Sequence, residues 1–210
     1  MHPAVELHAT QDVTDVPSIV RGAIKLGLIE SVAVLLFSLA SRFLPKGPVE
    51  TVVLAIILFA GLAAVALLPG LWTRARSIEG IAGSAGMSLA AAVVFLLIDA
   101  AVLQNIGTYT NRWYEIGGGS GWWYHPVWWM AGTFISWMGA WLLANGTARA
   151  GQPSAPVAFG TAIGCTIIAA IIGVVLGVPG AGWNLATFGV AFLPGIALAT
   201  ALSSLGSRRG

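Results

Sequence analysis

The chain has 210 residues, of which 57% are hydrophobic and only 9% are charged, and its mean hydropathy is +0.86. A soluble domain cannot hide that much apolar surface from water, so the composition predicts an integral membrane protein. The net charge of +2 is small and the basic residues are dispersed, which excludes nucleic acid as an expected partner.

Six apolar runs are long enough to cross the hydrocarbon core of a membrane. They lie at 26–44, 51–68, 81–103, 127–144, 157–178 and 183–205. Uninterrupted apolar runs favour helices over the alternating strands of a barrel, and the short connections carry the prolines, glycines and charges of turns. We therefore predict an all-α bundle of about six transmembrane helices. The bundle is expected to form a single domain at 19–206, between a polar cytoplasmic tail at 1–18 and a basic tail at 207–210.

The distribution of lysine and arginine predicts the orientation. With both termini in the cytoplasm, the larger group of basic residues falls on the cytoplasmic side, as the positive-inside rule requires. That group is Arg21, Lys25, Arg74, Arg76, Arg149, Arg208 and Arg209, and the outer group is Arg42, Lys46 and Arg112. We expect a multi-pass protein of the plasma membrane, specifically a prokaryotic inner membrane, with the loop from Gln104 to Trp122 facing outward.

Two ionisable residues fall at membrane depth, Glu30 in the first span and Asp99 in the third. Such groups cost free energy unless they are paired or wetted, which makes them candidates for function. A rise of 1.5 Å per residue puts Glu30 about 6 Å inward and Asp99 about 10 Å outward of the middle of their helices, too far apart to pair. Each is expected to be protonated, hydrogen-bonded to Ser31 or Gln104, or part of a wet path.

Most of the tryptophans belong to the outer loop and the fourth span. They are Trp113, Trp122, Trp123, Trp128, Trp129, Trp137 and Trp141. Tryptophan concentrates where lipid meets water, so an interfacial belt is the main expectation. Trp137 and Trp141 lie four residues apart on one helix face and deeper than a belt requires. We expect this pair to pack against neighbouring helices, lipid or pigment.

The loop allows a second interpretation. The segments "TYTNRWYEI" (108–116) and "WWYHPVWW" (122–129) flank a glycine-rich turn and could pair as a β-hairpin over the outer face, although Pro126 weakens the second arm. Such a hairpin would cover a cavity or dock a partner. His125 has the chemistry of a metal, haem or pigment ligand, but the other histidines lie in the tail on the opposite side. An interfacial hydrogen bond is therefore the favoured role for it.

Small residues predict how the fifth and sixth spans pack. Gly160 and Gly164 lie almost opposite Gly173 and Gly177 at 100° per residue, so the fifth span is expected to be held on both sides and central in the bundle. Pro194 predicts a kink in the sixth span.

The sequence contains no recognised catalytic signature and no metal-binding cluster, so we predict a non-catalytic protein that requires no metal. The leading hypothesis is a structural or accessory subunit that packs in the bilayer against other membrane subunits or copies of itself. Lipid or pigment could bind its Trp-rich and small-residue surfaces, although the sequence requires no cofactor. The alternative is a small oligomeric transporter or channel with a path near Asp99, Glu30 and Pro194.

Overall fold

The computed structural model describes residues 12–116 and 124–205. Within these ranges six helices are long and apolar enough to cross a membrane. They are α2 (Val16–Phe43), α3 (Pro48–Trp72), α4 (Ile78–Ile98), α6 (Tyr124–Ala150), α7 (Ala155–Val175) and α8 (Leu185–Leu205). A π-helical turn, η1 (Asp99–Leu103), extends α4, and the short α5 (Asn111–Glu115) precedes α6. The predicted all-helical architecture with six candidate spans is confirmed, and the described ranges contain no strand.

Residues at the helix starts explain where several spans begin. Asp15 caps α2 by accepting a hydrogen bond from the Ser18 N–H at 3.0 Å, and Ser77 caps α4 by accepting one from the Glu79 N–H at 3.2 Å. Pro48 opens α3, at a position whose missing N–H has no helical partner to lose. These residues satisfy or remove the N–H groups that every helix leaves unpaired at its start.

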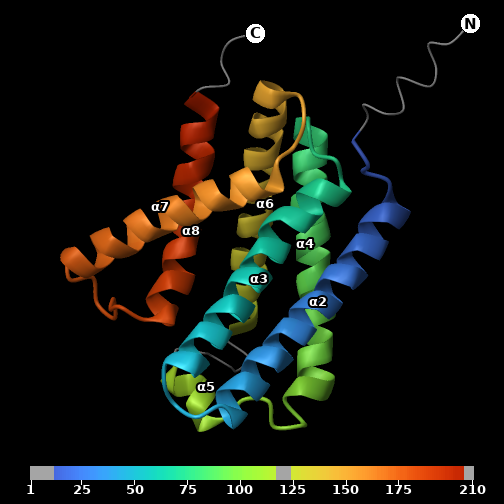
Figure 1. The fold of residues 1–210 in the computed structure, drawn as a ribbon. Coiled ribbons are helices and arrows are strands. Elements are labelled where there is room, and N and C mark those ends of the chain that lie inside the picture. The colour runs from blue at the N-terminus through green and yellow to red at the C-terminus, as the bar shows by residue number, and fades with distance from the viewer. Residues whose placement is uncertain (1–11, 117–123, 206–210) are drawn as a thin grey trace, which may run out of the picture.

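The helices form two packing units. Helices α2, α3, α4 and α6 make a four-helix unit, whereas α7 and α8 make a hairpin that joins this unit mainly through contacts between α8 and α6. Figure 1 shows α7 at the edge of the molecule, crossing obliquely over α8. The same view shows that α2 begins and α8 ends at one end of the bundle, here named the terminal end. The opposite end carries α5 and is named the α5 end.

Glycine allows close approach between helices within the four-helix unit. A Cβ atom on Gly27 of α2 would lie 2.8 Å from the carbonyl oxygen of Ala91 in α4. On Gly70 of α3 it would lie 2.9 Å from the Cα of Ala140 in α6. On Gly139 of α6 it would overlap the carbonyl oxygen of Ala66 in α3. The backbones therefore touch at these positions, as small residues permit inside a membrane.

The prediction that α7 lies central and is held on both sides is wrong. A Cβ on Gly160 or Gly164 would meet nothing within 4 Å, and one on Gly173 would only reach Ala181 at 4.0 Å. The helix instead buries a stripe of other small residues, which packs chiefly on α8. That stripe is Ala158, Ala162, Cys165, Thr166 and Ala170. Gly160 and Gly164 follow the stripe residues Ala158 and Ala162 by two positions each. Two positions correspond to about 200° around the helix, so both glycines fall on the opposite, exposed face of α7.

Gly177 has a different role from the one predicted. The residue lies beyond the end of α7 and has φ +66°, the left-handed conformation that favours glycine. Its N–H donates to the Val174 carbonyl at 3.1 Å, and the Val178 N–H donates to the Gly173 carbonyl at 3.0 Å. This geometry is typical of a glycine that terminates a helix. Gly177 is therefore required by the turn and not by helix packing.

The segment before α2 is fixed to the loop between α3 and α4. The Asp12 carboxylate accepts hydrogen bonds from the N–H groups of Arg76 and Ser77, both at 3.0 Å, and of Gly80 at 3.1 Å. A Cβ on Gly80 would lie 2.5 Å from Asp12 Oδ2, so glycine leaves room for the carboxylate. Part of the predicted polar tail thus serves as a cap for α4 at the terminal end.

The alternative prediction of a β-hairpin in the outer loop is wrong for its described arms. Asn111–Glu115 is helical, and Thr110 caps it by accepting a hydrogen bond from the Trp113 N–H at 3.4 Å. The second arm enters α6 from Tyr124 onward. The glycine-rich turn itself, at 117–123, lies outside the described residues. Helix capping by Thr110 therefore outweighs the β preference of the aromatic residues here.

Candidate functional site

The α5 end contains an ion-pair network around a buried carboxylate. Glu50 lies in the first turn of α3, where its side chain is only 2% exposed. Arg112 of α5 donates to both of its oxygens, from Nε to Oε1 at 2.9 Å and from Nη2 to Oε2 at 2.6 Å. This two-point geometry is the strongest arrangement available to a carboxylate and a guanidinium. The hydrogen bonds to Glu50 raise the pKa of Arg112 above its usual value.

The network continues outward to Glu115. Its Oε2 accepts from Lys46 Nζ at 3.0 Å and from Arg112 Nη1 at 3.1 Å. The hydrogen bond from Lys46 is the largest cause of a lowered pKa at Glu115. Lys46 follows α2, whereas Glu50 begins α3, and Arg112 and Glu115 belong to α5. The network therefore ties the loop between α2 and α3 to the segment between α4 and α6.

A second polar group lies where α4 changes to a π-helical turn. Asp99 is buried, and it accepts hydrogen bonds from Gln104 Nε2 at 2.7 Å and from the Tyr109 hydroxyl. Burial, followed by the hydrogen bond to Asp99, raises the pKa of Tyr109. Of the partners predicted for Asp99, Gln104 is confirmed, and Tyr109 is an addition. Single π-helical turns occur frequently at functional sites, which keeps Asp99 a candidate.

Trp113 closes the α5 end and is buried within the chain. It is 6% exposed, and its ring contacts Phe37 of α2 at 5.4 Å and Tyr109 at 5.1 Å, both edge-on. The Ser38 hydroxyl of α2 donates to the Thr108 carbonyl beside it. The segment before α6 is therefore folded back onto α2, and Trp113, predicted to contact a partner, lipid or pigment, packs mainly against its own chain.

The tryptophans of α6 divide between packing and exposure. The Trp128 ring contacts Phe95 of α4 at 5.4 Å but remains partly exposed, as do Trp129 and Trp137. The predicted pairing of Trp137 with Trp141 on one helix face is confirmed by ring centroids 6.2 Å apart. Trp122 and Trp123 lie outside the described residues, as does the side chain of His125, so their predicted roles stay predictions.

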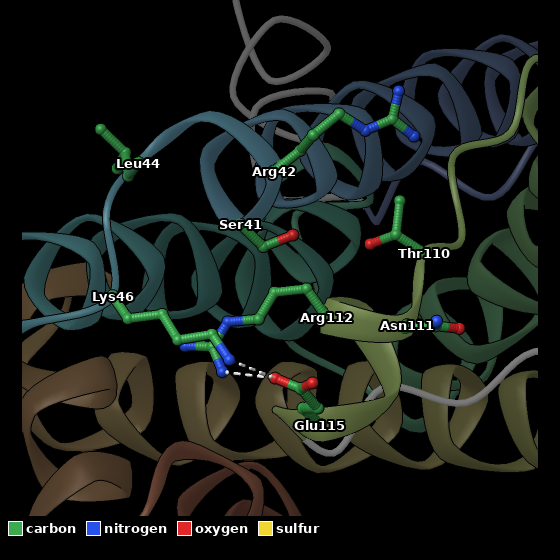
Figure 2. Close-up of a pocket in the computed structure, with 8 residues that line it drawn as sticks. All are labelled: Ser41, Arg42, Leu44, Lys46, Thr110, Asn111, Arg112 and Glu115. Carbon is green, nitrogen blue, oxygen red and sulfur yellow. Dashed lines mark hydrogen bonds and ion pairs between the residues drawn. The ribbon is translucent and has the colours of Figure 1, made fainter.

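The network borders a pocket of about 420 Å³ at the α5 end. Figure 2 shows it with Arg42 on the side away from the ion pairs that join Lys46 and Arg112 to Glu115. The lining residues are Ser41, Arg42, Leu44, Lys46, Thr110, Asn111, Arg112 and Glu115. The pocket thus combines three cationic side chains with one carboxylate.

Glu30 contrasts with the other acidic residues of the helices. It lies near the middle of α2, half-buried, on the side that carries the buried Leu26 and Ser31. Ser31 donates to the Gly27 carbonyl at 2.8 Å, so the predicted bond to Glu30 is absent. Among the described residues none forms a hydrogen bond or ion pair with the Glu30 carboxylate.

The structure does not bring together the three residues of the predicted path. Glu30 and Asp99 belong to the four-helix unit, whereas Pro194 lies in α8, which has no packing contact with α2 or α4. Gly195, next to Pro194, packs against α7, where its Cβ would lie 2.6 Å from the Cα of Thr166. Close contact between α7 and α8 therefore accounts for the small residue at this position. The kink stays a prediction.

Sequence reasoning missed the pairing of Glu50 with Arg112. Glu50 falls one residue before the predicted second span, so the sequence pattern does not place it at membrane depth. The available signal was topological, because the six-span arrangement puts Glu50 and Arg112 on the same side of the membrane. A lone acid at the edge of one span and a lone arginine in a facing loop are natural partners.

The described ranges contain no group of three His, Cys, Asp or Glu residues that could hold a metal ion. Comparison with known proteins finds no matching family model, no matching curated protein and no matching solved structure.

Proposed function

We propose that the protein is a non-catalytic, multi-pass subunit of a prokaryotic inner membrane that associates with another membrane helix through the exposed face of α7. The observation that carries this proposal is the pair Gly160 and Gly164, which lies one helical turn apart and at which a Cβ atom would meet no other part of the described chain within 4 Å. The partner is another membrane subunit or a second copy of the chain.

Three other helical glycines of the chain can be compared with this pair. Gly27, Gly70 and Gly139 each lie against the backbone of a neighbouring helix. Helices in lipid gain no hydrophobic free energy by associating, so they rely on close packing at such small residues. Gly160 and Gly164 have the same spacing that favours close approach, but their face of α7 is open. A partner helix seated there would complete the pattern.

The α6 tryptophans support a second contact surface. Trp129 and Trp137 are partly exposed, and Met130 between them is 74% exposed. A tryptophan ring offers a large apolar area together with one N–H donor, and this combination is suited to contact with lipid, pigment or a partner protein. Arg21 and Lys25 lie in the first ten residues of α2 and Arg149 in the last turn of α6, and these parts of the two helices point to the terminal end, which supports its cytoplasmic placement.

The test replaces both α7 glycines with leucine and measures the mass of the complex extracted gently from its native membrane. Gly160→Leu with Gly164→Leu should reduce the amount of the assembled form at least tenfold, because the branched side chains keep a partner backbone away. Gly86→Leu is the matched control, because Gly86 is an exposed helical glycine of α4 with nothing within 4 Å. Equal loss in both variants, or a monomeric wild-type protein, would contradict the proposal.

A proton-conducting transporter is the second candidate, and the unpartnered Glu30 carboxylate favours it. An intramembrane acid without a partner is costly, and proton relays use such groups. Asp99 would contribute through its hydrogen bonds to Gln104 and Tyr109. In liposomes with an imposed membrane potential, this candidate predicts proton entry that Glu30→Gln abolishes and Glu79→Gln leaves unchanged. Proton entry no faster than in protein-free liposomes would exclude it.

A further inference from the structure

The pocket at the α5 end carries an excess of positive charge. Three cations line it, whereas the network offers only two carboxylates: Glu50 is bound to Arg112, and Glu115 to both Arg112 and Lys46. Arg42 has no carboxylate partner among the described residues, and its hydrogen bond goes to the Gly107 carbonyl. A guanidinium has five N–H donors, so most of those on Arg42 are left for a ligand.

The pocket lies at the boundary between helix ends and loop. α2 ends at Phe43 and α3 begins at Pro48, so the lining residues Leu44 and Lys46 belong to the connection between two candidate spans. Lipid phosphate groups lie at this level of a bilayer, just beyond the hydrocarbon core. A ligand in the pocket would therefore lie beside phosphate groups rather than acyl chains.

Exposed apolar side chains belong to the two helix ends that flank the lining residues Leu44 and Lys46. Phe43 at the end of α2 is 72% exposed, and Val49 at the start of α3 is 64% exposed. An anion that touched only the cations would leave these side chains without a partner. An amphipathic anion would place its charge at Arg42 and its acyl chains along exposed apolar side chains such as Phe43, the next residue of α2.

We infer that this pocket binds the phosphate group of an anionic phospholipid through the guanidinium of Arg42, while Lys46, paired with Glu115 on the other side of the pocket (Figure 2), adds to the positive charge that attracts it. The inference is independent of the proposed assembly through α7, which uses the other packing unit. Arginine and lysine are the usual partners of phosphate, and an excess of positive charge favours an anionic lipid over a zwitterionic one.

The experiment titrates the full-length protein in neutral detergent with phosphatidylglycerol or phosphatidylcholine and counts retained lipids by native mass spectrometry. The wild-type chain should retain one phosphatidylglycerol with about tenfold preference over phosphatidylcholine. Arg42→Gln with Lys46→Gln should remove that preference. The control, Arg21→Gln with Lys25→Gln, removes the same charge at the terminal end and should leave the preference within about twofold.

Two further measurements distinguish binding of the lipid from a general effect of net charge and from unfolding of the variants. Exchanging the two cations, as Arg42→Lys with Lys46→Arg, keeps the charge and should retain the preference, while the unfolding temperature confirms that each variant is folded. Inorganic phosphate at matched concentration should compete only weakly, because it lacks acyl chains. Equal retention of both lipids, equal loss in the control variant, or phosphate that binds as tightly as the lipid would overturn the inference.

Discussion

The four-helix unit and the α7–α8 hairpin use the same small residue in opposite ways. In the four-helix unit, Gly27, Gly70 and Gly139 lie where two helix backbones touch. In the hairpin, Gly195 has this role against α7, but Gly160 and Gly164 on the far side of α7 meet nothing. Glycine spacing therefore indicates a helix face suited to close approach, whereas only the tertiary structure identifies the helix that occupies that face.

The two units also differ in how their polar groups are satisfied. The four-helix unit and the segments packed on it contain an ion pair between the buried Glu50 of α3 and Arg112 of α5, and a capping carboxylate at Asp12. The hairpin has mainly hydroxyl groups that bond to their own helix, such as Thr166 to the Ala162 carbonyl at 2.7 Å. We therefore expect substitutions in the four-helix unit to affect folding and those on the open face of α7 to affect assembly.

The largest effect is expected at Gly139. Gly139→Ala puts a Cβ into the backbone of α3, which cannot yield as a flexible side chain would. The cost should reach about 3 kcal/mol or more, at the upper end for an overpacked core. Thermal unfolding in detergent measures it. Gly146→Ala on the same helix is the control, because nothing lies within 4 Å of Gly146, and a similar loss there would contradict the contact.

The next effect is expected at Arg112. Arg112→Ala leaves the buried Glu50 carboxylate unpaired, which costs about 3–5 kcal/mol for a fully buried pair. Because the Arg112 side chain is 25% exposed, water can replace part of its interaction, and we expect about 2–3 kcal/mol. Adding Glu50→Gln to Arg112→Ala should restore part of the stability in the same unfolding assay. A double variant less stable than Arg112→Ala would show that Glu50 needs no partner.

A smaller effect is expected from the cap at Asp12. Asp12→Ala should cost about 1 kcal/mol, as loss of an N-terminal cap does. Burial raises the pKa of Asp12, but hydrogen bonds from Ser77, Arg76 and Gly80 outweigh it, so the pKa is lower than usual. The contribution of Asp12 to the free energy of unfolding should therefore be complete above the ordinary pKa of aspartate. It should decline as the pH falls through the lowered pKa of Asp12. Urea unfolding at several pH values would measure this loss of stability. An equal loss of stability at low pH in Asp12→Ala would show that other groups cause it.

The smallest effect on folding is expected at Gly164. Gly164→Ala adds a methyl group to open space on a helix and should stabilise the separated protein by about 0.5–1 kcal/mol. Gly195→Ala is the matched change on the α8 side and should destabilise it, because its Cβ meets the backbone of Thr166. Thermal unfolding in detergent compares the two. A loss of stability in Gly164→Ala would mean that this face is occupied within the chain.

Periodicity and composition predicted the helices, because a run of apolar residues long enough to cross a membrane has few other solutions. The helix partners could not be predicted in the same way. The contact stripe of α7 consists of alanine, cysteine and threonine residues such as Ala162 and Thr166, whose apolar or neutral character does not distinguish them from lipid-facing positions. The spacing of Gly177 predicts a packing position, but this glycine terminates α7. The Glu50–Arg112 pair joins residues 62 apart, so no local pattern contained it.

The most direct test of the proposed assembly is a photo-crosslinking side chain at position 168 in living cells. Ile168 is 51% exposed and lies one turn beyond Gly164 on α7, whereas Val93 of α4 is 44% exposed and is the control position. The proposal predicts a discrete protein adduct from position 168 and none from position 93. Absence of a protein adduct at position 168, or identical adducts at both positions, would contradict assembly through α7.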